Sequence, residues 1–295
     1  MEIRTMRMFV EVVRQGGFSR AAKTVFATQS TVSKAVKQLE EELGLQLLER
    51  IGHRSSLTAA GEIVYRRAVT ILAEGDDLTS ELKGLQGLKG GTLRLGFPLI
   101  GSNTLFARWF ADYRTLYPDV DLQLVEHGSK RLEELLLAGE LDLAASLLPA
   151  SEEFAWQELR REPIDVLLAA DHPLAGRAKI TFKALENDPC ILYGSGFALN
   201  PIILEACREN GFTPKVIAQS SQIDFIIELV AAKLGIAFLP RMIAEQRPHP
   251  LTRRVAVGPP TIYWHMALIW RRGGYLSHAA QAWLALAGSS GGKKQ

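Results

Sequence analysis

The chain has 295 residues, enough for two or three domains, and its 47% hydrophobic and 22% charged residues are typical of an ordinary globular protein. A net charge of +2 says nothing about nucleic acid, so any basic surface must be local. No apolar run is long enough to span a membrane, and charged residues in the first segment exclude a signal peptide, so we expect a cytoplasmic protein with no membrane partner.

Three short helices are predicted at the start of the chain. Apolar residues recur at helical spacing over residues 5–14, and two glycines follow. Ser19 is a good N-cap for a helix over residues 20–25, and Thr28 is one for a third helix that begins at Gln29. Two helices joined by a short turn form the helix-turn-helix pattern, in which the second helix enters the major groove of DNA.

The third helix carries two contrasting stripes. One is apolar and is predicted to face the core: Val32, Val36, Leu39 and Leu43. The other carries hydroxyls and ammonium groups: Ser30, Ser33, Lys34 and Lys37. No acidic residue lies between Glu11 and Glu40, whereas five basic residues do. A helical bundle with a solvated polar face is the plain alternative, but the missing acidic residues favour a polyanion, and we expect double-stranded DNA.

A wing is predicted after the third helix. The segment LQLLERIGHRSSLT, which follows Gly44, is predicted to form two short strands around a turn at Gly52. Arg50, His53 and Arg54 would lie on this wing, near the DNA backbone or the minor groove.

The stretch from GGFSRAAK to LTAAGE resembles the winged helix-turn-helix of LysR-type transcriptional regulators, in its FSRAA, in the run QSTVSKAVKQLEEELGLQLLER and in its LTAAG. The resemblance implies that residues 29–37 belong to the recognition helix and that Arg54 lies on the wing. Ser30 stands where the family often has proline, and His53 where it often has arginine. The candidate DNA-binding residues are Ser19, Lys23, Gln29, Ser30, Thr31, Ser33, Lys34, Lys37, Arg50, His53 and Arg54.

A long linker helix is predicted from Ala59, with Thr58 as its cap, to about Gln86. Its apolar positions are Val64, Ala68, Ile71, Leu78, Leu82 and Leu85. When Gly75 is counted as a member of this stripe, successive positions are alternately four and three residues apart. This spacing is typical of a coiled coil, so we expect a dimer, although a helix folded onto its own domain is the alternative. Two heads on one dimer would read a two-fold related DNA site. Glycines then mark a hinge: Gly84, Gly87, Gly90 and Gly91.

Strands and helices alternate from Thr92 onward, which indicates an α/β fold with a mostly parallel sheet. Strands are predicted over residues 93–97, 120–127, 141–148, 164–170, 188–196, 214–220, 236–240 and 263–273. Helices are predicted over residues 103–117, ending before Pro118, and over 129–139, 200–211, 222–235 and 276–288.

Two such α/β halves resemble a periplasmic-binding-protein fold, the effector domain of LysR-type regulators. The predicted domains are a winged helix-turn-helix at 1–58, a linker helix at 59–87, an effector domain at 88–288 and a disordered tail at 289–295. Within the effector domain, subdomain I is expected at 92–163 plus 265–288 and subdomain II at 164–264.

A small-molecule effector is expected in the crevice between these halves, beyond the carboxyl ends of the strands. The candidate residues follow three predicted strands: Ser102, Asn103, Thr104, Ser195, Gly196, Phe197, Gln219 and Ser220. Hydroxyls and backbone N–H groups at a helix start suit a carboxylate, so we expect an organic anion, although each residue is also a plausible helix cap. The resemblance further implies a homodimer that assembles to a homotetramer, contact with RNA polymerase, and regulation of a neighbouring gene.

Three other functions compete with this interpretation. An enzyme is disfavoured, because Ser195 lacks the spacing of a nucleophile elbow and the six histidines lack metal-ligand spacing, so we expect no catalytic residue, no metal and no cofactor. A transport-type binding protein would need an export signal. A redox sensor of the same family is the more serious alternative, since one branch senses peroxide with a cysteine pair, and this chain has Cys190 and Cys207.

Overall fold

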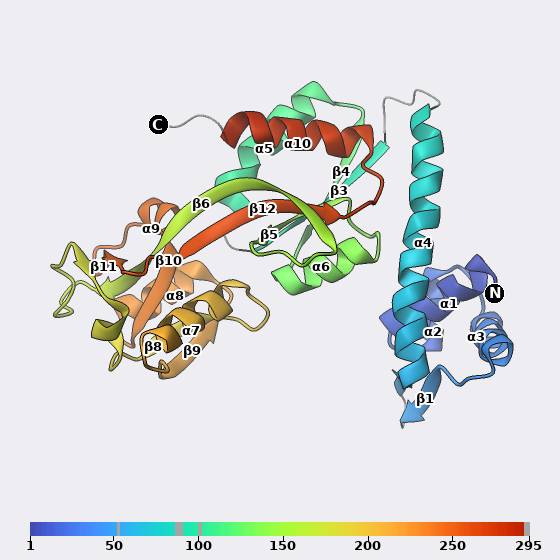
Figure 1. The fold of residues 1–295 in the computed structure, drawn as a ribbon, viewed down its shortest axis with the longest axis horizontal. Helices are drawn as coiled ribbons and strands as arrows, with labels where there is room; N and C mark the ends of the chain where they lie inside the picture. The colour runs from blue at the N-terminus through green and yellow to red at the C-terminus, as the bar shows by residue number, and fades with distance from the viewer. Residues whose placement is uncertain (52–53, 86–90, 100–101, 292–295) are drawn as a thin grey trace. The chain divides into compact units, whose positions relative to one another are not determined.

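The computed structural model of the chain describes residues 1–51, 54–85, 91–99 and 102–291. These residues fold as two compact units, Met1–Leu88 with Leu137–Glu140, and Lys89–Leu136 with Leu141–Gln295. Figure 1 labels most of the helices and strands of both units. No helix in the described part of the chain is long and apolar enough to cross a membrane.

The first unit consists of three short helices, a two-stranded wing and a long helix. In chain order these are α1 (Ile3–Arg14), α2 (Phe18–Thr24), α3 (Gln29–Leu43), β1 (Leu48–Ile51), β2 (Arg54–Leu57) and α4 (Ala59–Leu85). The wing strands pair antiparallel, with Leu48 opposite Leu57. The winged helix-turn-helix and the linker helix predicted from the sequence are therefore confirmed, and residues 1–58 are called the head below.

The head is built around the apolar faces of α1 and α3. Phe9 of α1 and Val32 and Leu39 of α3 are fully buried, as their helical spacing predicts. Leu43 is 37% exposed, so its predicted place in this core is wrong. It is the last residue of α3, and Gly44, in the left-handed conformation, ends the helix before a further turn can cover it.

Helix α2 begins earlier than predicted. Gly17 occupies its N-cap position, so the prediction of Ser19 as a cap is wrong. Phe18 packs partly buried against the core, which places Ser19 within the first turn of the helix. The Ser19 hydroxyl donates instead to Oε1 of Gln29, at 3.0 Å.

Three hydrogen bonds and one close backbone approach fix the wing between α3 and α4. Oε1 of Glu40 accepts hydrogen bonds from the backbone N–H groups of Leu47, at 2.8 Å, and Leu48, at 3.1 Å. The Thr58 hydroxyl accepts from the N–H of Gly61 at 3.0 Å, which confirms its cap. A Cβ on Gly61 would lie 2.0 Å from the carbonyl oxygen of Leu47, so only glycine lets α4 approach the wing this closely.

Helix α4 changes its surroundings along its length. In its first half Ala68 is buried and Val64 partly buried against the head, so their predicted place in a dimer seam is wrong. Further along, Ile71, Leu78 and Leu82 are 40%, 59% and 53% exposed. Only this second part of the predicted stripe is open to a partner.

The predicted hinge falls mostly outside the described residues. Gly87 and Gly90 lie in the undescribed segment 86–90, and the side chain of Leu85 is also outside the described part. Gly91 begins the first strand of the second unit.

The second unit alternates strands and helices, as predicted. Its strands are β3 (Gly91–Phe97), β4 (Val120–Glu126), β5 (Leu143–Leu147), β6 (Phe154–Ala169), β7 (Lys179–Ile180), β8 (Cys190–Tyr193), β9 (Val216–Ser220), β10 (Ile236–Pro240), β11 (Thr252–Val257) and β12 (Tyr263–Arg271). Its helices are α5 (Ser102–Leu116), α6 (Ser129–Leu137), α7 (Leu199–Glu209), α8 (Ile223–Ala231), α9 (Arg241–Gln246) and α10 (His278–Gly291), with a short 3-10 helix at Phe182–Leu185.

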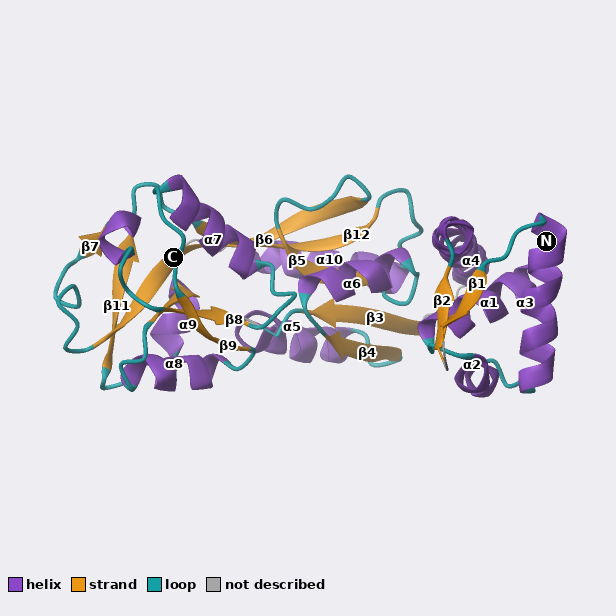
Figure 2. Cartoon of the chain, turned by 90° about the horizontal axis from the view of Figure 1, so that it is seen from below, coloured by secondary structure: helices purple, strands orange, loops and turns teal. Residues whose placement is uncertain are grey.

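Two long strands, β6 and β12, join two lobes (Figure 1). Strand β6 pairs with β12 from Phe154 to Pro163, and with β10 and β11 from Ile164 onward. The main sheet runs in the order β4-β3-β5-β12-β6-β10-β8-β9. We call the part built on β3, β4 and β5 with α5, α6 and α10 lobe I, and the part built on β8, β9 and β10 with α7, α8 and α9 lobe II; Figure 2 shows the helices that cover both.

An aromatic cluster fastens α10 to α5 in lobe I. The ring of Trp283 lies 5.1 Å from that of Phe110 and 5.2 Å from that of Tyr113, between centroids. The Tyr113 hydroxyl donates to the carbonyl oxygen of Ala279 at 2.9 Å, and burial raises the pKa of Tyr113 to about 12, so the phenol remains a donor.

A buried carboxylate organises lobe II. Asp165 of β6 is 1% exposed and accepts two hydrogen bonds from Arg241, at 2.9 and 3.1 Å, and one from Arg254, at 2.5 Å. A buried charge is tolerated only when it is paired, so these contacts tie β6 to α9 and β11.

Parts of the second unit differ from the sequence prediction. Strands β7 and β11, helix α9 and residues 154–163 of β6 were not predicted. Most of residues 154–163 are exposed or partly exposed, and they carry four charged groups, so they contain no apolar run. The prediction of a disordered tail is wrong for residues 289–291, which continue α10. Residues 292–295 lie outside the described part of the chain.

Candidate nucleic-acid interface and effector crevice

The polar stripe of α3 is open to solvent. Ser30, Ser33, Lys34 and Lys37 are all exposed, whereas Val32 and Val36 between them are buried. The helix therefore uses its apolar side for the core and leaves its hydroxyls and ammonium groups for a partner.

Hydrogen bonds order the start of α3. The Thr28 hydroxyl accepts from the backbone N–H of Thr31 at 3.2 Å, which confirms the predicted N-cap. Its oxygen also lies 2.9 Å from the Ser30 hydroxyl and 2.8 Å from the Thr31 hydroxyl. Because Ser19 donates to the side-chain oxygen of Gln29, the amide NH₂ of Gln29 is left to donate elsewhere.

The three lysines of the head are lightly engaged, unlike Arg7 and Arg14, which form ion pairs. Among the described residues, no acidic group pairs with the exposed side chains of Lys23 or Lys34. Lys37 lies 3.5 Å from Glu41, but both side chains are mostly exposed, so this ion pair contributes little. All three ammonium groups are therefore available to phosphates.

The wing places its basic residues on two paired strands. Arg50 of β1 is opposite Ser55, and Arg54 of β2 is opposite Ile51. The side chains of these arginines, and the whole of His53, lie outside the described residues.

The loop after β8 is held by Asn200, a residue that the sequence did not single out. Its side-chain oxygen accepts from the N–H of Tyr193 at 3.0 Å, and its NH₂ donates to the carbonyls of Tyr193 and Gly194, at 2.9 and 3.2 Å. Ser195 and Gly196 are exposed in this loop.

Lobe I approaches the same loop through Gly128. A Cβ on Gly128 would lie 2.8 Å from the carbonyl oxygen of Gly196, so the backbones of the two lobes are in contact here. Ser129, the first residue of α6, is buried beside this contact. Neither residue was predicted, because nothing in the local sequence shows which loop of lobe I faces Gly196.

The other predicted crevice residues differ in their surroundings. Ser220 has a structural role, since its hydroxyl accepts from the N–H of Gln222 at 3.1 Å and its carbonyl from the N–H of Gly194 at 3.0 Å. Gln219 is exposed on β9. Ser102 begins α5 as expected, but the side chains of residues 102–104 lie outside the described part.

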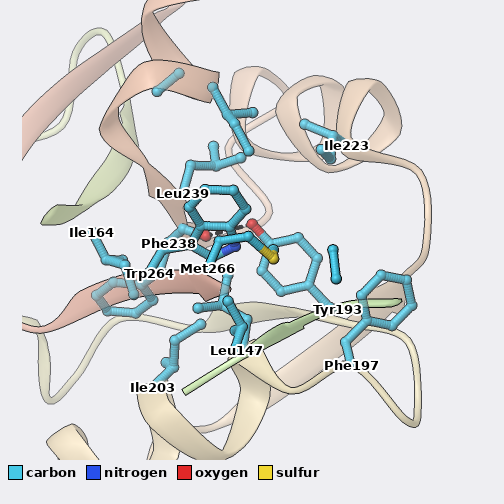
Figure 3. Packing of buried hydrophobic residues seen from close by; sticks show 14 of the residues in the cluster. Leu147, Ile164, Tyr193, Phe197, Ile203, Ile223, Phe238, Leu239, Trp264 and Met266 are labelled. Atoms are coloured by element: carbon cyan, nitrogen blue, oxygen red, sulfur yellow. Dashed lines mark hydrogen bonds between the residues drawn. The ribbon is translucent and has the colours of Figure 1, made fainter. Parts of the chain in front are cut away.

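The interior between the lobes is apolar (Figure 3). Leu147 and Met266 lie here with Tyr193, Phe197 and Phe238, and the ring of Phe197 stacks on that of Tyr193 at 5.9 Å between centroids. The Tyr193 hydroxyl donates to the carbonyl of Phe238 at 2.7 Å, and burial raises the pKa of this phenol. Phe197, predicted as a ligand contact, is thus a buried support of the loop.

The two cysteines are free thiols inside lobe II. Cys190 and Cys207 are both fully buried. Burial raises the pKa of Cys190 to about 12, with a contribution from Cys207, and that of Cys207 to about 11. Among the described residues, no three histidine, cysteine or acidic side chains are grouped to hold a metal ion.

A head with an exposed cationic helix, joined by a long helix to a two-lobed α/β domain, defines a DNA-binding transcriptional regulator with a ligand-binding domain. Two family profiles match the chain: the bacterial regulatory helix-turn-helix protein of the lysR family over residues 3–62, and the LysR substrate-binding domain over residues 86–291. The chain belongs to the LysR family of transcriptional regulators.

Relatives and solved structures agree with this assignment. The chain is 38% identical to the uncharacterized HTH-type transcriptional regulator YwbI of Bacillus subtilis, over 96% of this chain and 95% of YwbI. It is 26% identical to a full-length OxyR variant from Pseudomonas aeruginosa, with a TM-score of 0.69 over 99% of this chain and 97% of that protein. A peroxide-bound OxyR mutant from Corynebacterium glutamicum is also 26% identical, with a TM-score of 0.59 over 100% of this chain and 97% of that protein.

Proposed function

We propose that this regulator binds promoter DNA through α3 and the wing, in the bacterial cytoplasm, and responds to a small molecule held between its two lobes. The observation that carries the proposal is the exposed stripe of Ser30, Ser33, Lys34 and Lys37, opposite a buried face of the same helix. A helix that presents hydroxyl and ammonium groups to a major groove combines base-edge donors with phosphate neutralisation.

The candidate residues divide by their chemistry. Gln29, Ser30, Thr31 and Ser33, at the start of α3, are proposed to contact base edges, because the first turns of a recognition helix reach deepest into the groove. Lysines and Ser19 are proposed to contact phosphates. Arg50, His53 and Arg54 are proposed to reach the backbone or minor groove from the wing.

A dimer is proposed through the second half of α4. Ile71, Leu78 and Leu82 expose their side chains on one stripe at intervals of seven and four residues, which is the spacing of a coiled-coil seam. The two edges of the main sheet also expose apolar side chains, Leu124 on β4 and Ile217 on β9, and this supports the further assembly of dimers into a tetramer. Contact with RNA polymerase is part of the proposal.

The effector is proposed to be an organic anion. Ser102, Asn103 and Thr104 begin the 15-residue helix α5, and a helix N-terminus offers N–H donors and a favourable dipole to a carboxylate. Exposed Ser195 and Gln219 supply polar contacts from lobe II, and Ser129 adds a hydroxyl from lobe I. Because Gly128 and Gly196 are in contact, an effector between the lobes must separate these two loops.

The proposed regulatory mechanism is a difference between the affinities of the effector for two arrangements of the protein. An effector shifts the assembly only by as much as it prefers one arrangement of lobes and linker helices over another. The arrangement that it favours would change the spacing of the two heads on DNA.

Redox sensing is the second candidate function, and the similarity to OxyR structures is the observation that favours it. The structure disfavours it, because thiols with pKa values of about 12 and 11 contain almost no thiolate at neutral pH, and thiolate is the form that reacts with peroxide. Loss of the transcriptional response in Cys207→Ser, with DNA binding intact, would instead establish it.

The proposal is tested with the full-length protein in two assays. Binding to the DNA upstream of its own gene should weaken steeply as salt rises, with a slope of log affinity against log salt of about −0.9 for each phosphate contact. A thermal-shift screen of organic acids should find compounds that raise the melting temperature. A melting temperature that no organic acid changes would contradict the effector assignment and leave the DNA assay unaffected.

A further inference from the structure

A side-chain hydrogen bond joins the starts of α2 and α3. Ser19 is the second residue of α2, and Gln29 is the first residue of α3. The Ser19 hydroxyl donates to Oε1 of Gln29 at 3.0 Å. In the part of the chain that the structure describes, no group accepts a hydrogen bond from the NH₂ group of Gln29. The bond therefore occupies one end of the amide and leaves the other end free.

The two residues lie where DNA is proposed to bind. Both are exposed, and Gln29 precedes the exposed Ser33 by four residues, so these two side chains lie on the same face of α3. A serine hydroxyl has one hydrogen, and phosphate oxygens only accept hydrogen bonds, so this hydroxyl cannot bind a phosphate while it donates to Gln29. The phosphate contact proposed for Ser19 falls to its backbone N–H, since the first N–H groups of a helix have no partner within the helix.

The orientation of the Gln29 amide decides which base it reads. A glutamine with both ends free pairs with adenine, because its oxygen accepts from the N6 amine while its nitrogen donates to N7. With its oxygen turned to Ser19, Gln29 faces the groove with two N–H donors instead. Guanine offers two acceptors there, N7 and O6, whereas cytosine offers the N4 amine, which is a donor. The arrangement therefore favours guanine and disfavours cytosine.

We propose that Ser19 is a positioning residue, which holds the Gln29 amide so that this amide reads guanine in the major groove. The inference rests on the proposed DNA binding and names the specificity of one residue of that interface. A long side chain loses rotamer freedom when it is fixed against a base, and a bond that already holds the amide lowers this cost. Exclusion of water from the interface also strengthens the bond, because solvent no longer competes for it.

The test measures base preference rather than affinity alone. Full-length protein binds fluorescent fragments of its own upstream DNA, in which each base pair is replaced in turn by the other three, and affinity is measured by anisotropy. The position at which Gln29→Ala no longer distinguishes the bases is the position that Gln29 reads. There we expect the parent protein to bind guanine about tenfold more tightly than cytosine, and Ser19→Ala to retain a preference of no more than about twofold.

Two further substitutions test the direction of the bond. Ser19→Thr keeps the hydroxyl and should keep the preference for guanine. Gln29→Glu keeps one oxygen for Ser19 but presents a second oxygen in place of the NH₂ group, and a carboxylate accepts from the N4 amine of cytosine. We expect this variant to bind more weakly on every sequence, because it adds a negative charge, and to prefer cytosine over guanine at the same position.

A double substitution and a matched control separate positioning from other roles. Ser19→Ala combined with Gln29→Ala should lose no more affinity or discrimination than Gln29→Ala alone, because Ser19 acts through Gln29. Thr24→Ala removes another exposed hydroxyl of α2, which donates to the carbonyl oxygen of Arg20 at 3.3 Å, and should leave every base preference unchanged.

Any of three results would overturn the proposal. Equal weakening of Ser19→Ala on every sequence, or an unchanged preference for guanine in this variant, would show that the hydroxyl does not position Gln29. A preference of the parent protein for adenine at the Gln29 position would show that the amide is turned the other way. Base preferences that Gln29→Ala leaves unchanged at every position would remove Gln29 from base contact. Failure of the parent protein to bind its upstream DNA at all would instead contradict the proposed function itself, and this is seen before any variant is made.

Discussion

In the head, Ser30, Ser33 and Lys34 project into solvent from a helix that is fixed by its own cap and core, whereas in the second unit Ser195 lies on a loop that touches Gly128 of the opposite lobe. The first surface can accept a partner as it stands. In the second, a ligand bound as proposed would replace the contact between these two loops. The two regions therefore suit different tasks, since a preformed helix face gives a fixed geometry and a contact that a ligand replaces gives a response.

The fixed geometry of the head depends most on Gly61, so its substitution gives the largest expected effect. A Cβ 2.0 Å from the carbonyl oxygen of Leu47 cannot be accommodated without moving α4 off the wing. We expect Gly61→Ala to lower the free energy of unfolding by about 3 kcal/mol, measured by urea denaturation. Gly75→Ala, where a Cβ meets no atom within 4 Å, is the control and should be no less stable than the parent. Equal stability of both variants would show that this contact is not tight.

The two buried cysteines test whether water is excluded from the interior of lobe II. Their pKa values lie above the ordinary value near 9, so the unfolded state loses these protons first as pH rises, and stability present below pH 9 is lost between about pH 9 and 12. As pH rises above 9, each buried thiol should lower the free energy of unfolding by about 1.4 kcal/mol per pH unit, Cys207 up to about pH 11 and Cys190 up to about pH 12. Cys190→Ala should have a shallower decline than the parent in denaturant titrations at pH 9 to 11. An identical decline would mean that Cys190 is hydrated.

Substitution of Lys34 tests whether the exposed polar stripe of α3 contacts DNA. We expect Lys34→Ala to weaken binding to upstream DNA by about tenfold and to reduce the salt slope by about 0.9, because one phosphate contact is lost. Lys215→Ala, an exposed lysine of the second unit, should change neither quantity. A salt slope that Lys34→Ala leaves unchanged would place Lys34 off the interface.

The smallest expected effect concerns the backbone of the turn before α3. Phe26 has a φ of 51° in this turn, and its side chain is 97% exposed. Replacing Phe26 by glycine should raise the free energy of unfolding by about 1 kcal/mol, since the left-handed conformation costs glycine little and the exposed ring contributes no packing. Thermal or urea unfolding of the two proteins measures this difference. A destabilised Phe26→Gly would show that the ring packs within the head.

The sequence predicted the head better than the crevice, for physical reasons. Thr28 and Thr58 cap their helices as expected, because capping depends on residues only three positions away. Ser19 failed as a cap because burial of Phe18 extended α2 by tertiary packing. In the same way, Ala68 has the spacing of a dimer seam, yet the head covers it.

The crevice depends on contacts between distant segments, which local patterns do not contain. The approach of Gly128 to Gly196 joins loops of different lobes. Asn200 was also missed, although it acts locally, on the loop that precedes its own helix. Strand β6 was only half predicted, since its first part faces solvent on one side and lacks an apolar run. Positions that follow strand ends were predicted, but which of them meet across the crevice was not.

The central claim is that the hydroxyl and ammonium side of α3 lies against DNA. Lysine acetylation of the full-length protein, quantified by mass spectrometry with and without its upstream DNA, tests this residue by residue. We predict that DNA protects Lys23, Lys34 and Lys37 from acetylation and leaves Lys183 and Lys215 unchanged. If the three lysines of the head are acetylated as fast in the DNA complex as in free protein, the claim is contradicted.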